Sequence, residues 1–387
     1  MIYFFLFFLS VWVMFLVIAY RAQLYLRSLD DFSTGQSGHM VSIVTAVRNA
    51  EKDIEATLTK LLKVCPVNCE IIAVNDRSTD KTEEILLKMQ TVFPLLKVIH
   101  IKDLPIGWLG KVHALHQGSK HANGDFMLFM DVDVEVNQNS INSALRACDV
   151  FELDHLGVLP DFHQGDYLLN VMTATTILLF TLSARPWHGI KKRPVESTKG
   201  VGAFNLVKKS AFDGTEGFEW LKMDVADDVA LAQLIAKNRG RSLLMKAGKN
   251  GPALHWYESF KDLVNGLEKN IVGGFTNYKL SLVFFMSFFS ISTLVIPIAA
   301  LSFYKTPSIF YMGVEYIVFT LIFALMVKKF MKHSFMAIAS IPLGVTLMGI
   351  ILLRSSYICF KNGGIRWSGT FYPLKDLKEG TRVKLGL

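Results

Sequence analysis

Three segments of the sequence are long enough and apolar enough to cross a lipid bilayer. They lie at 1–20, 280–304 and 334–353 and contain no charged residue, and a fourth run, 306–327, is interrupted only by Glu315. A helix needs roughly 20 apolar residues to span the hydrocarbon core of a membrane. About 260 residues of mixed polarity separate the first run from the others, which is enough for one large domain. The sequence therefore predicts a multi-pass membrane protein with transmembrane helices at both ends.

The N-terminal run has two interpretations, a cleaved signal peptide or a membrane anchor. No Lys or Arg precedes it, and no small-residue cleavage site closes it before Arg21, so we favour an anchor. Arg21 and Arg27 follow the run directly. Positive charge beside a transmembrane helix favours the cytoplasmic side. We therefore expect the large domain to lie in the cytoplasm, at a bacterial inner membrane.

The formal net charge of +8 and the cysteines bear on two other interpretations, a nucleic-acid-binding protein and a structural zinc site. The basic residues are scattered or lie beside apolar runs, so a membrane surface explains them better than nucleic acid does. Cys65 and Cys69 have C-x3-C spacing without a second ligand pair nearby, which makes a zinc site unattractive. We predict ordinary thiols in a reducing compartment.

From residue 40 onward, short β-branched runs alternate with helical periodicity. Ile54, Leu58 and Leu61 share one helix face, and Ser78 or Thr79 is the expected N-cap of the next helix. The predicted strands are 41–47, 70–75, 96–101 and 126–130. Alternation of this kind predicts an α/β fold with a mostly parallel sheet and helices on both faces.

The fourth predicted strand leads directly into Asp131-Val132-Asp133. Alternate residues of an extended segment point the same way, so both carboxylates would face one site. Mg²⁺ and Mn²⁺ prefer oxygen ligands and often bridge to phosphates. A lone D-x-D also arises by chance in solvated turns, but here it follows a buried strand. The motif therefore predicts a divalent-cation site at the carboxyl edge of the sheet.

Three further segments carry polar groups that suit nucleotide chemistry. NDRSTD at 75–80 ends a strand and presents Asp76, and GWLGK at 107–111 is a flexible loop with the cation Lys111. Asp227-Asp228 opens an apolar helix. Each also has a plainer interpretation, since the first two are compatible with surface turns and the aspartates with helix capping.

In this order, the segments resemble the family 2 glycosyltransferases, whose catalytic domain has the GT-A fold. RNAE at 48–51 resembles R-N-E-E of that family, and 75–80 resembles its D-D-G-S-T-D. Residues 107–111 match G-W-x-G-K, 131–133 match D-x-D, and Asp227-Asp228 lies where the family has E-D. The resemblance covers the chain from Val41 to Asp228.

The resemblance implies a role for each matching residue. Asp76 would bind a uridine-type nucleotide, Lys111 its diphosphate, and Asp131 the ribose or sugar. Asp133, with Asp131, would hold Mg²⁺ or Mn²⁺. Asp228 would be the general base, supported by Asp227. The other residues that the resemblance places at the donor site are Ala46, Arg48, Glu51 and Val132.

Three positions depart from the pattern of the family. Ala46 stands where proline is frequent, and Arg77 stands where glycine is usual, next to the nucleotide. The processive polysaccharide synthases carry Q-x-x-R-W, whereas this chain keeps Arg366-Trp367 and has Gly363 in place of the glutamine. The resemblance therefore favours transfer of a single sugar with inversion over chain extension.

The segment 256–272 has apolar residues at helical spacing and charges on the opposite face. It is typical of a helix in the membrane interface, although packing on the soluble core gives the same pattern. We interpret the apolar stretch 167–184 as a helix against the membrane or the acceptor site, and not as a membrane span. Such a platform suits a lipid acceptor. The plan resembles the membrane-bound branch that includes ceramide, hopanoid-pathway and carotenoid-acid glycosyltransferases, with Arg366 and Trp367 at the acceptor side.

The expected organisation has five parts. They are an anchor at 1–20, a GT-A domain at 40–255, an interfacial region at 256–279, transmembrane helices at 280–353 and a basic cytoplasmic tail at 354–387. One N-terminal and three C-terminal spans would place the tail outside, so one segment, containing Glu315 or Pro342, is expected to be re-entrant. The expected partners are a UDP-sugar, a lipid and the membrane, without nucleic acid. Polyprenyl phosphate as acceptor, a polysaccharide synthase and a non-catalytic binder remain as alternatives.

Overall fold

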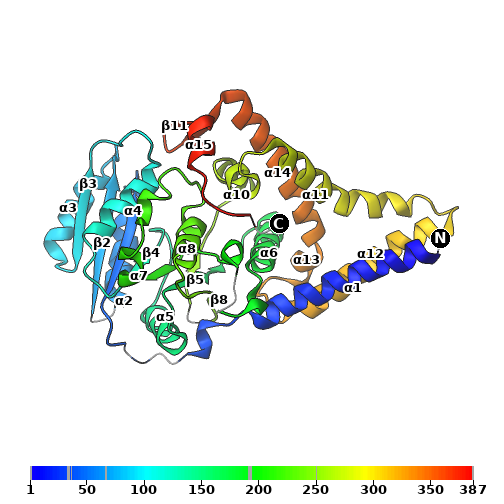
Figure 1. Cartoon of the computed structure of the whole chain (residues 1–387), viewed down its shortest axis with the longest axis horizontal. Helices are drawn as coiled ribbons and strands as arrows, with labels where there is room; N and C mark the ends of the chain where they lie inside the picture. The colour runs from blue at the N-terminus through cyan, green and yellow to red at the C-terminus, as the bar shows by residue number, and fades with distance from the viewer. Residues whose placement is uncertain are drawn as a thin grey trace. The chain divides into compact units, whose positions relative to one another are not determined.

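The chain forms two compact units, which we describe separately (Figure 1). The computed structural model describes residues 2–32, 35, 37–65, 68–190, 194–249 and 251–385, and in the first helix the side chains of residue 10 and of residues from 13 onward. The helical unit comprises residues 1–26, 164–187 and 256–362. The sheet unit comprises residues 27–163, 188–255 and 363–387. The chain therefore passes repeatedly from one unit to the other.

The sheet unit is built on a seven-stranded sheet with the order β3-β2-β1-β4-β7-β5-β8. All neighbouring pairs are parallel except those of β7, which runs antiparallel between β4 and β5. The strands are β1 (Val41–Val47), β2 (Cys69–Asp76), β3 (Leu96–Ile101), β4 (Phe126–Phe129), β5 (His155–Leu159), β7 (Asn205–Lys208) and β8 (Ser242–Lys246). The predicted α/β fold with a mostly parallel sheet is confirmed.

The central strands end at one edge of the sheet. The first four residues of β1, from Val41 to Val44, each lie between a residue of β2 and one of β4 in parallel register, so that Val44 pairs with Ile72 and Phe129. Asp76 is the last residue of β2, and Asp131 follows β4 by two positions. The two carboxylates therefore belong to the carboxyl edge, where ligands bind in sheets of this kind.

Helices flank this sheet (Figure 1). Their bounds are α2 (Ile54–Val64), α3 (Thr82–Val92), α4 (Gly110–Lys120), α5 (Gln138–Phe151), α7 (Lys209–Asp213), α8 (Asp227–Lys237) and α15 (Leu374–Gly380). Helix α4 contacts β1 and β2 at close range, because a Cβ on Gly118 would lie only 2.4 Å from Val44 Cγ1 and 3.0 Å from Val74 Cγ2. Two small ribbons complete the unit: β6 (Asp161–Phe162) with β9 (Ala253–Leu254), and the hairpin β10 (Gly364–Trp367) with β11 (Thr370–Pro373).

Two local predictions were wrong. The N-cap of α3 is Lys81, and Ser78 instead accepts a hydrogen bond from the backbone N–H of Asn49. Asp80 instead forms a hydrogen bond with the first turn of α3, because its Oδ1 accepts from the N–H of Thr82. Cys65 and Cys69 form a disulfide rather than remaining as thiols.

The helical unit consists of long apolar helices around a small core. Its elements are α1 (Ile2–Tyr25), α6 (Tyr167–Ala184), α9 (Phe260–Glu268), α10 (Ile271–Thr276), α11 (Leu280–Leu301), α12 (Pro307–Lys328), α13 (Phe335–Ala339) and α14 (Ile341–Asn362). The core joins small and large side chains of several helices, among them Ala19 of α1, Leu178 of α6, Ala324 of α12 and Ile341 of α14. Small residues such as Ala19 and Ala324 allow apolar helices to approach closely.

Four described helices are long and apolar enough to cross a membrane: Tyr167–His188, Leu280–Leu301, Pro307–Lys328 and Ile341–Asn362. Several large side chains of α11 lie open on its surface, with Phe284, Phe285, Phe288 and Phe289 between 63% and 73% exposed. Contiguous apolar exposure of this extent marks a surface that another apolar phase covers. The helical unit has the composition of a membrane-embedded body.

The helical unit differs in detail from the expected segments. The predicted run 334–353 divides into α13 and α14, and α14 continues to Asn362 past the expected start of the tail. The amphipathic segment 256–272 breaks between α9 and α10. In α1 the described apolar part, Val13–Tyr25, is shorter than a span. Most side chains of the predicted anchor at 1–20 lie outside the described residues, so the anchor stays a prediction.

Candidate active site

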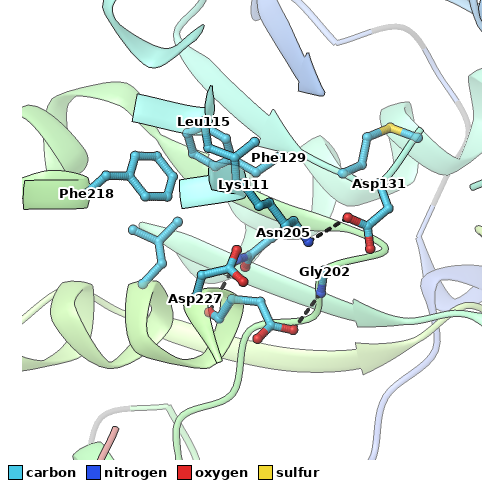
Figure 2. A pocket seen from close by; sticks show the side chains of 11 residues that line it. Lys111, Leu115, Phe129, Asp131, Gly202, Asn205, Phe218 and Asp227 are labelled. Carbon is cyan, nitrogen blue, oxygen red and sulfur yellow. Dashed lines mark hydrogen bonds and ion pairs between the residues drawn. The ribbon is translucent and has the colours of Figure 1, made fainter. Parts of the chain in front are cut away.

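A pocket opens beside the carboxyl end of β4 and contains four of the ionisable residues singled out from the sequence (Figure 2). Asn205 of β7 lies beside Phe129 of β4 in the sheet, and the N-terminus of α8 supplies two aspartates. The residues that line the pocket are Lys111, Leu115, Phe129, Met130, Asp131, Gly202, Asn205, Phe218, Asp227, Asp228 and Leu231. The pocket thus joins a polar, mostly acidic part to an apolar wall.

Lys111 is the cation of this pocket. It lies in the first turn of α4, and its Nζ is 2.6 Å from Asp131 Oδ1. Burial favours the neutral amine, but the carboxylates of Asp131, Asp227 and Asp228 outweigh it and raise the pKa of Lys111. Lys111 therefore carries a full positive charge, which suits contact with an anionic group of a ligand.

Asp227 and Asp228 occupy the first turn of α8. Burial, together with the neighbouring charge of Asp228 and Asp131, raises the pKa of Asp227 to about 7, although Lys111 opposes the shift. Burial also raises the pKa of Asp228. A carboxylate whose pKa is raised towards neutrality is a better proton acceptor than an ordinary aspartate.

Backbone groups fix the orientation of the Asp228 carboxylate. Its Oδ1 accepts from the N–H of Val229 at 2.8 Å, and its Oδ2 accepts from the N–H of Gly202 at 2.8 Å. The carbonyl of Gly202 in turn accepts from the N–H of Asp131 at 3.0 Å. A Cβ at Gly202 would lie 3.2 Å from Asp131 Oδ2 and 3.6 Å from Lys111 Nζ. Gly202 therefore joins the two acidic segments and has to remain small.

A buried polar chain supports α8 from the sheet. Asn205 Nδ2 donates to the carbonyl of Asp228 at 3.3 Å, and Asn205 Oδ1 lies 2.6 Å from His155 Nε2. The other ring nitrogen of His155 lies 2.7 Å from Ser242 Oγ. His155 is fully buried. Because each ring nitrogen has a partner, the imidazole has a fixed orientation and positions Asn205.

A second polar group lies at the end of β2. The guanidinium of Arg77 donates to both oxygens of Asp76, from Nε at 2.7 Å and from Nη2 at 3.0 Å. Arg48 Nη1 approaches Asp76 Oδ2 at 3.5 Å. A Cβ at Gly110 would lie 2.6 Å from both Arg77 Nη2 and Asp76 Oδ2. This group therefore adjoins the N-terminus of α4, directly before Lys111.

The hairpin of β10 and β11 contacts this second group. Arg77 Nη1 donates to Thr370 Oγ1 at 3.4 Å, and the N–H of Gly110 donates to the hydroxyl of Tyr372 at 3.1 Å. Arg366 is exposed on β10, with its guanidinium 5.7 Å from the ring centre of Phe371. The predicted Arg366 and Trp367 thus lie on the hairpin, but the contacts to the second group come from Thr370 and Tyr372.

The structure places the predicted site residues in different parts of the sheet unit. Lys111, Asp131, Asp227 and Asp228 line one pocket, and Asp76 with Arg48 adjoins it. Ala46 lies within β1 opposite Val74. Glu51 bonds to the 78–82 loop, through the N–H of Lys81 to its carboxylate and its own N–H to Asp80, and so it acts as a structural link.

The geometry expected for the D-x-D segment was wrong. Strand β4 ends at Phe129, and Val132 and Asp133 lie in a turn that is closed by the N–H of Val134 and the carbonyl of Asp131. The alternation of an extended strand therefore does not apply. Asp131 lines the pocket, whereas Val132 and Asp133 are not among its lining residues. Likewise, Gly110 and Lys111 begin helix α4 rather than lying in a flexible loop.

Sequence reasoning missed Gly202, Asn205, Thr370 and Tyr372. The only local signal was the pair of glycines in KGVGAF at 199–204, which alone is compatible with any tight turn. Asn205 and Tyr372 act through partners far away in the sequence, since Tyr372 and Gly110 are 262 positions apart.

The donor set of the pocket fits a hard divalent cation. The carboxylates of Asp131, Asp227 and Asp228 share one lysine, and burial together with the neighbouring carboxylates raises the pKa of Asp227 to about 7. Among the described residues, no group of three His, Cys, Asp or Glu side chains is arranged to hold an ion by itself. This suits Mg²⁺ or Mn²⁺ held by one or two carboxylates together with phosphate oxygens of a substrate.

The sheet order, the acidic pocket and its lysine define a nucleotide-sugar-dependent transferase domain of GT-A type. Residues 42–212 match the model of the family described as glycosyl transferase family 2. The chain thus contains a region that matches a family 2 glycosyltransferase domain.

Two curated relatives illustrate what the chain is similar to. The 4,4'-diaponeurosporenoate glycosyltransferase of Staphylococcus haemolyticus is 27% identical over 238 residues, which are 61% of this chain and 54% of that protein. The enzyme of the same name from Staphylococcus aureus (strain USA300) is 23% identical over 350 residues, 86% of this chain and 88% of that protein. The chain thus spans about half the length of the first relative and most of the second.

A solved structure supports the fold. The mannosyltransferase of Pyrobaculum calidifontis, in complex with GDP-Man and Mn²⁺, superposes with a TM-score of 0.55 at 13% sequence identity. The superposition covers 91% of this chain and 96% of the mannosyltransferase.

Proposed function

We propose that the protein transfers a single hexose, with inversion, from a UDP-sugar to a hydroxyl or carboxyl group of a lipid at the membrane surface. The observation that carries this proposal is the pocket in which Lys111, Asp131 and Asp228 meet beside the carboxyl end of β4. A cation for a diphosphate and an oriented carboxylate for a proton lie in one site. That combination is what a glycosyl transfer from a nucleotide diphosphate requires.

The donor would extend from Asp76 to Asp131. Asp76 and Arg48 would bind the nucleotide base, and Lys111 would pair with the diphosphate, because it begins a helix whose N–H groups and dipole also favour an anion. Asp131 would orient the ribose or the sugar from the opposite side of Lys111. The apolar wall of Phe129, Phe218 and Leu231 excludes water from the reacting bond.

Asp228 is the proposed general base. The N–H groups of Gly202 and Val229 hold both of its oxygens, and burial raises its pKa. Asp228 would accept the proton of the acceptor hydroxyl, or orient an acceptor carboxylate, as the acceptor oxygen attacks the anomeric carbon. The bond from the anomeric carbon to the diphosphate oxygen breaks on the opposite face, which inverts the configuration.

A divalent cation, Mg²⁺ or Mn²⁺, fits beside this pair as part of the proposal. Asp131 and Asp133 would hold it, and when bound it neutralises charge that develops on the departing diphosphate. The Pyrobaculum mannosyltransferase, which has a similar fold, is in complex with Mn²⁺, and this supports the use of a divalent cation. Lys111 contributes the same neutralisation from the protein side.

The acceptor is proposed to be a lipid. The helical unit provides long apolar helices with exposed phenylalanines, and the relatives act, by their names, on a carotenoid acid. A substrate that partitions into a bilayer has to be met at the bilayer surface. Arg21 and Arg27 place the sheet unit on the cytoplasmic side of the membrane in this proposal. Polyprenyl phosphate as acceptor is the second candidate, because it has the same location.

The decisive experiment measures release of UDP from UDP-sugars by the full-length protein in membrane lipid extract with Mn²⁺. The D228N variant is expected to lose transfer by at least about 10³-fold, since the base contributes typically 10²–10⁴-fold, while it still binds UDP. Asp213, an exposed aspartate paired with Lys209, provides the matched control D213N, which should keep wild-type turnover. A D228N protein that turns over normally refutes the assignment of the base.

Mass spectrometry of the lipid product separates the alternatives. A neutral or ester-linked glycolipid supports the proposal, and a glycosyl phospho-polyprenol supports the second candidate. A soluble polymer identifies a polysaccharide synthase. If UDP binds but no donor is consumed with any lipid, the chain is a binder and the proposed function is wrong.

A further inference from the structure

Arg77 has a backbone conformation that is unfavourable for a residue with a Cβ atom. Its φ of 54° lies in the left-handed region, which costs a residue with a Cβ about 1–2 kcal/mol. The resembling family has glycine at this position, which adopts the same conformation without that cost. The chain has arginine here although this backbone conformation favours glycine. Any advantage of arginine over glycine at this position therefore has to come from its side chain.

That side chain forms one rigid unit with Asp76. Two guanidinium nitrogens donate to the two carboxylate oxygens at 2.7 and 3.0 Å. The side chain of Asp76 is 6% exposed and that of Arg77 is 17% exposed. Thr370 accepts from Nη1 on the other side of the guanidinium. A planar, bidentate pair with a third contact has little freedom to reorient.

The unit offers a carboxylate acceptor and guanidinium donors side by side. A guanidinium has five N–H donors and a carboxylate about four lone-pair sites, so the contacts named above do not saturate either group. Gly110, which has no side chain, packs directly against both groups. The unit therefore adjoins the start of α4, one residue before the lysine that would hold the diphosphate.

We propose that Asp76 and Arg77 together read the base of the donor nucleotide, and that Arg77 determines its specificity. An acceptor beside a donor complements an edge that carries an N–H next to a carbonyl, as in uracil. Cytosine presents a ring nitrogen acceptor next to an amino donor. In the same orientation, its acceptor would face the carboxylate acceptor and its donor would face the guanidinium donor. The unit thus selects a base with an N–H beside a carbonyl, such as uracil, over cytosine. The inference rests on the proposed function, which places the nucleotide at Asp76.

Two other roles of Arg77 predict different behaviour. If its charge only attracted the diphosphate, all nucleoside diphosphates would benefit equally. If Arg77 instead occupied the subsite and excluded the base, its removal would strengthen binding. Discrimination between two pyrimidine diphosphates separates these roles from base reading, because UDP and CDP differ only at the edge of the base.

The experiment measures the affinity of the full-length protein in detergent for UDP and for CDP, each with Mn²⁺, by isothermal titration calorimetry. Wild type is expected to prefer UDP by about 10- to 100-fold, as 1–3 kcal/mol is typical of one bidentate base contact. R77G, which also relieves the backbone, should lose most of that preference, mainly through weaker UDP binding. R77K keeps the charge without the fork, and it should lose the preference as well.

The matched control is R241A, which removes an arginine of the same unit that pairs with Glu152. It should keep the wild-type ratio of the two affinities. Equal losses of UDP and CDP binding in R77G, or tighter binding of either, would overturn the inference while leaving the proposed function intact. If wild type binds neither nucleotide and consumes no donor, the proposed function fails, and the inference fails with it.

Discussion

The backbone N–H of Gly202 donates a 2.8 Å hydrogen bond to Oδ2 of Asp228. The carbonyl of the same glycine accepts from the N–H of Asp131. One residue without a side chain therefore sets the separation between the carboxylate proposed as base and the carboxylate proposed to orient the donor. The position of the base relative to the donor depends on this single peptide segment.

Substitution of Gly202 by alanine should impair turnover without unfolding the protein. The new methyl group would lie 3.2 Å from Asp131 Oδ2 and close to Asp228 and Lys111, so these groups have to shift. Misplacement of reacting groups by about 1 Å costs about 10²-fold in rate, and we expect a loss of this order in kcat. Gly214 is the matched control, since its Cβ would meet no atom closer than 3.5 Å. Equal turnover of G202A and G214A would contradict the positioning role.

Glu70 should make the sheet unit sensitive to acid. Its carboxylate is 5% exposed and accepts from Ser42 Oγ at 2.6 Å, the N–H of Asn123 at 2.7 Å and Lys97 Nζ at 2.5 Å. Burial alone would raise the pKa of Glu70, but these hydrogen bonds outweigh it and hold the pKa below its ordinary value of 4.5. The ionised form therefore stabilises the fold above about pH 4.5, and this contribution is lost as the pH falls through the lowered pKa.

The E70Q variant tests this dependence by urea unfolding of the detergent-solubilised protein. At pH 7 its free energy of unfolding should be lower by about 2 kcal/mol, because hydrogen bonds to a charged group are removed. Towards pH 3 the two proteins should converge. Glu216, which is exposed, gives the control E216Q with wild-type stability at every pH. A difference that persists unchanged at pH 3 would exclude the ionised carboxylate as its source.

Asp224 should hold the C-terminal segment in place. Its Oδ2 accepts from the N–H groups of Arg382 at 2.6 Å and Val383 at 2.9 Å, and the residue is 2% exposed. The D224A variant leaves both donors without this acceptor, at a cost of about 1–3 kcal/mol. Trypsin should then cleave after Arg382 at least about tenfold faster, as followed by mass spectrometry. Cleavage at the wild-type rate would show that other contacts, such as those of Gln233 with Lys384, hold the segment alone.

Phe288 should face lipid. It is 73% exposed near the middle of α11, and arginine at the centre of a transmembrane helix costs about 2.5–3.5 kcal/mol on insertion scales. The F288R variant should therefore reduce the fraction of protein that resists carbonate extraction from membranes. F288L keeps an apolar side chain at the same position and should behave as wild type. Full retention of F288R would place this face of α11 against water.

The sheet could be predicted because its strands have strong local signals. The run at 41–47 is β-branched and buried along its length, and Asp76 and Asp131 mark the strand ends. Parallel strands bring their carboxyl ends to one edge, so Asp76 and Asp131 were expected at that edge from the strands alone, whereas Lys111 and Asp228 were expected at the site only from the family resemblance. The helix expected at 167–184 was confirmed with the same bounds as α6. It was not expected to be a span, however, and Tyr167–His188 is long and apolar enough to cross a membrane.

The remaining features depend on contacts between distant parts of the chain. The turn at Val132 and Asp133 differs from the expected strand, because the backbone of Asp131 bonds to Gly202 and its carboxylate to Lys111. The disulfide between Cys65 and Cys69 gave no local signal beyond a spacing that thiols share. No periodicity marks Gly202 or Tyr372, since both act through hydrogen bonds to segments that only the fold brings near.

The sheet unit is discontinuous in the sequence, and this limits how it can be isolated. Cutting the chain after His255 would remove residues 256–362 of the helical unit, but it would also delete residues 363–387 of the sheet unit. The fragment would lose the hydroxyl of Tyr372 at Gly110 and both tail donors of Asp224. Residues 164–187, which belong to the helical unit, would remain as an apolar insertion. Biochemistry of this transferase therefore calls for the entire polypeptide in detergent or nanodiscs, since no single cleavage point separates its chemistry from its membrane part.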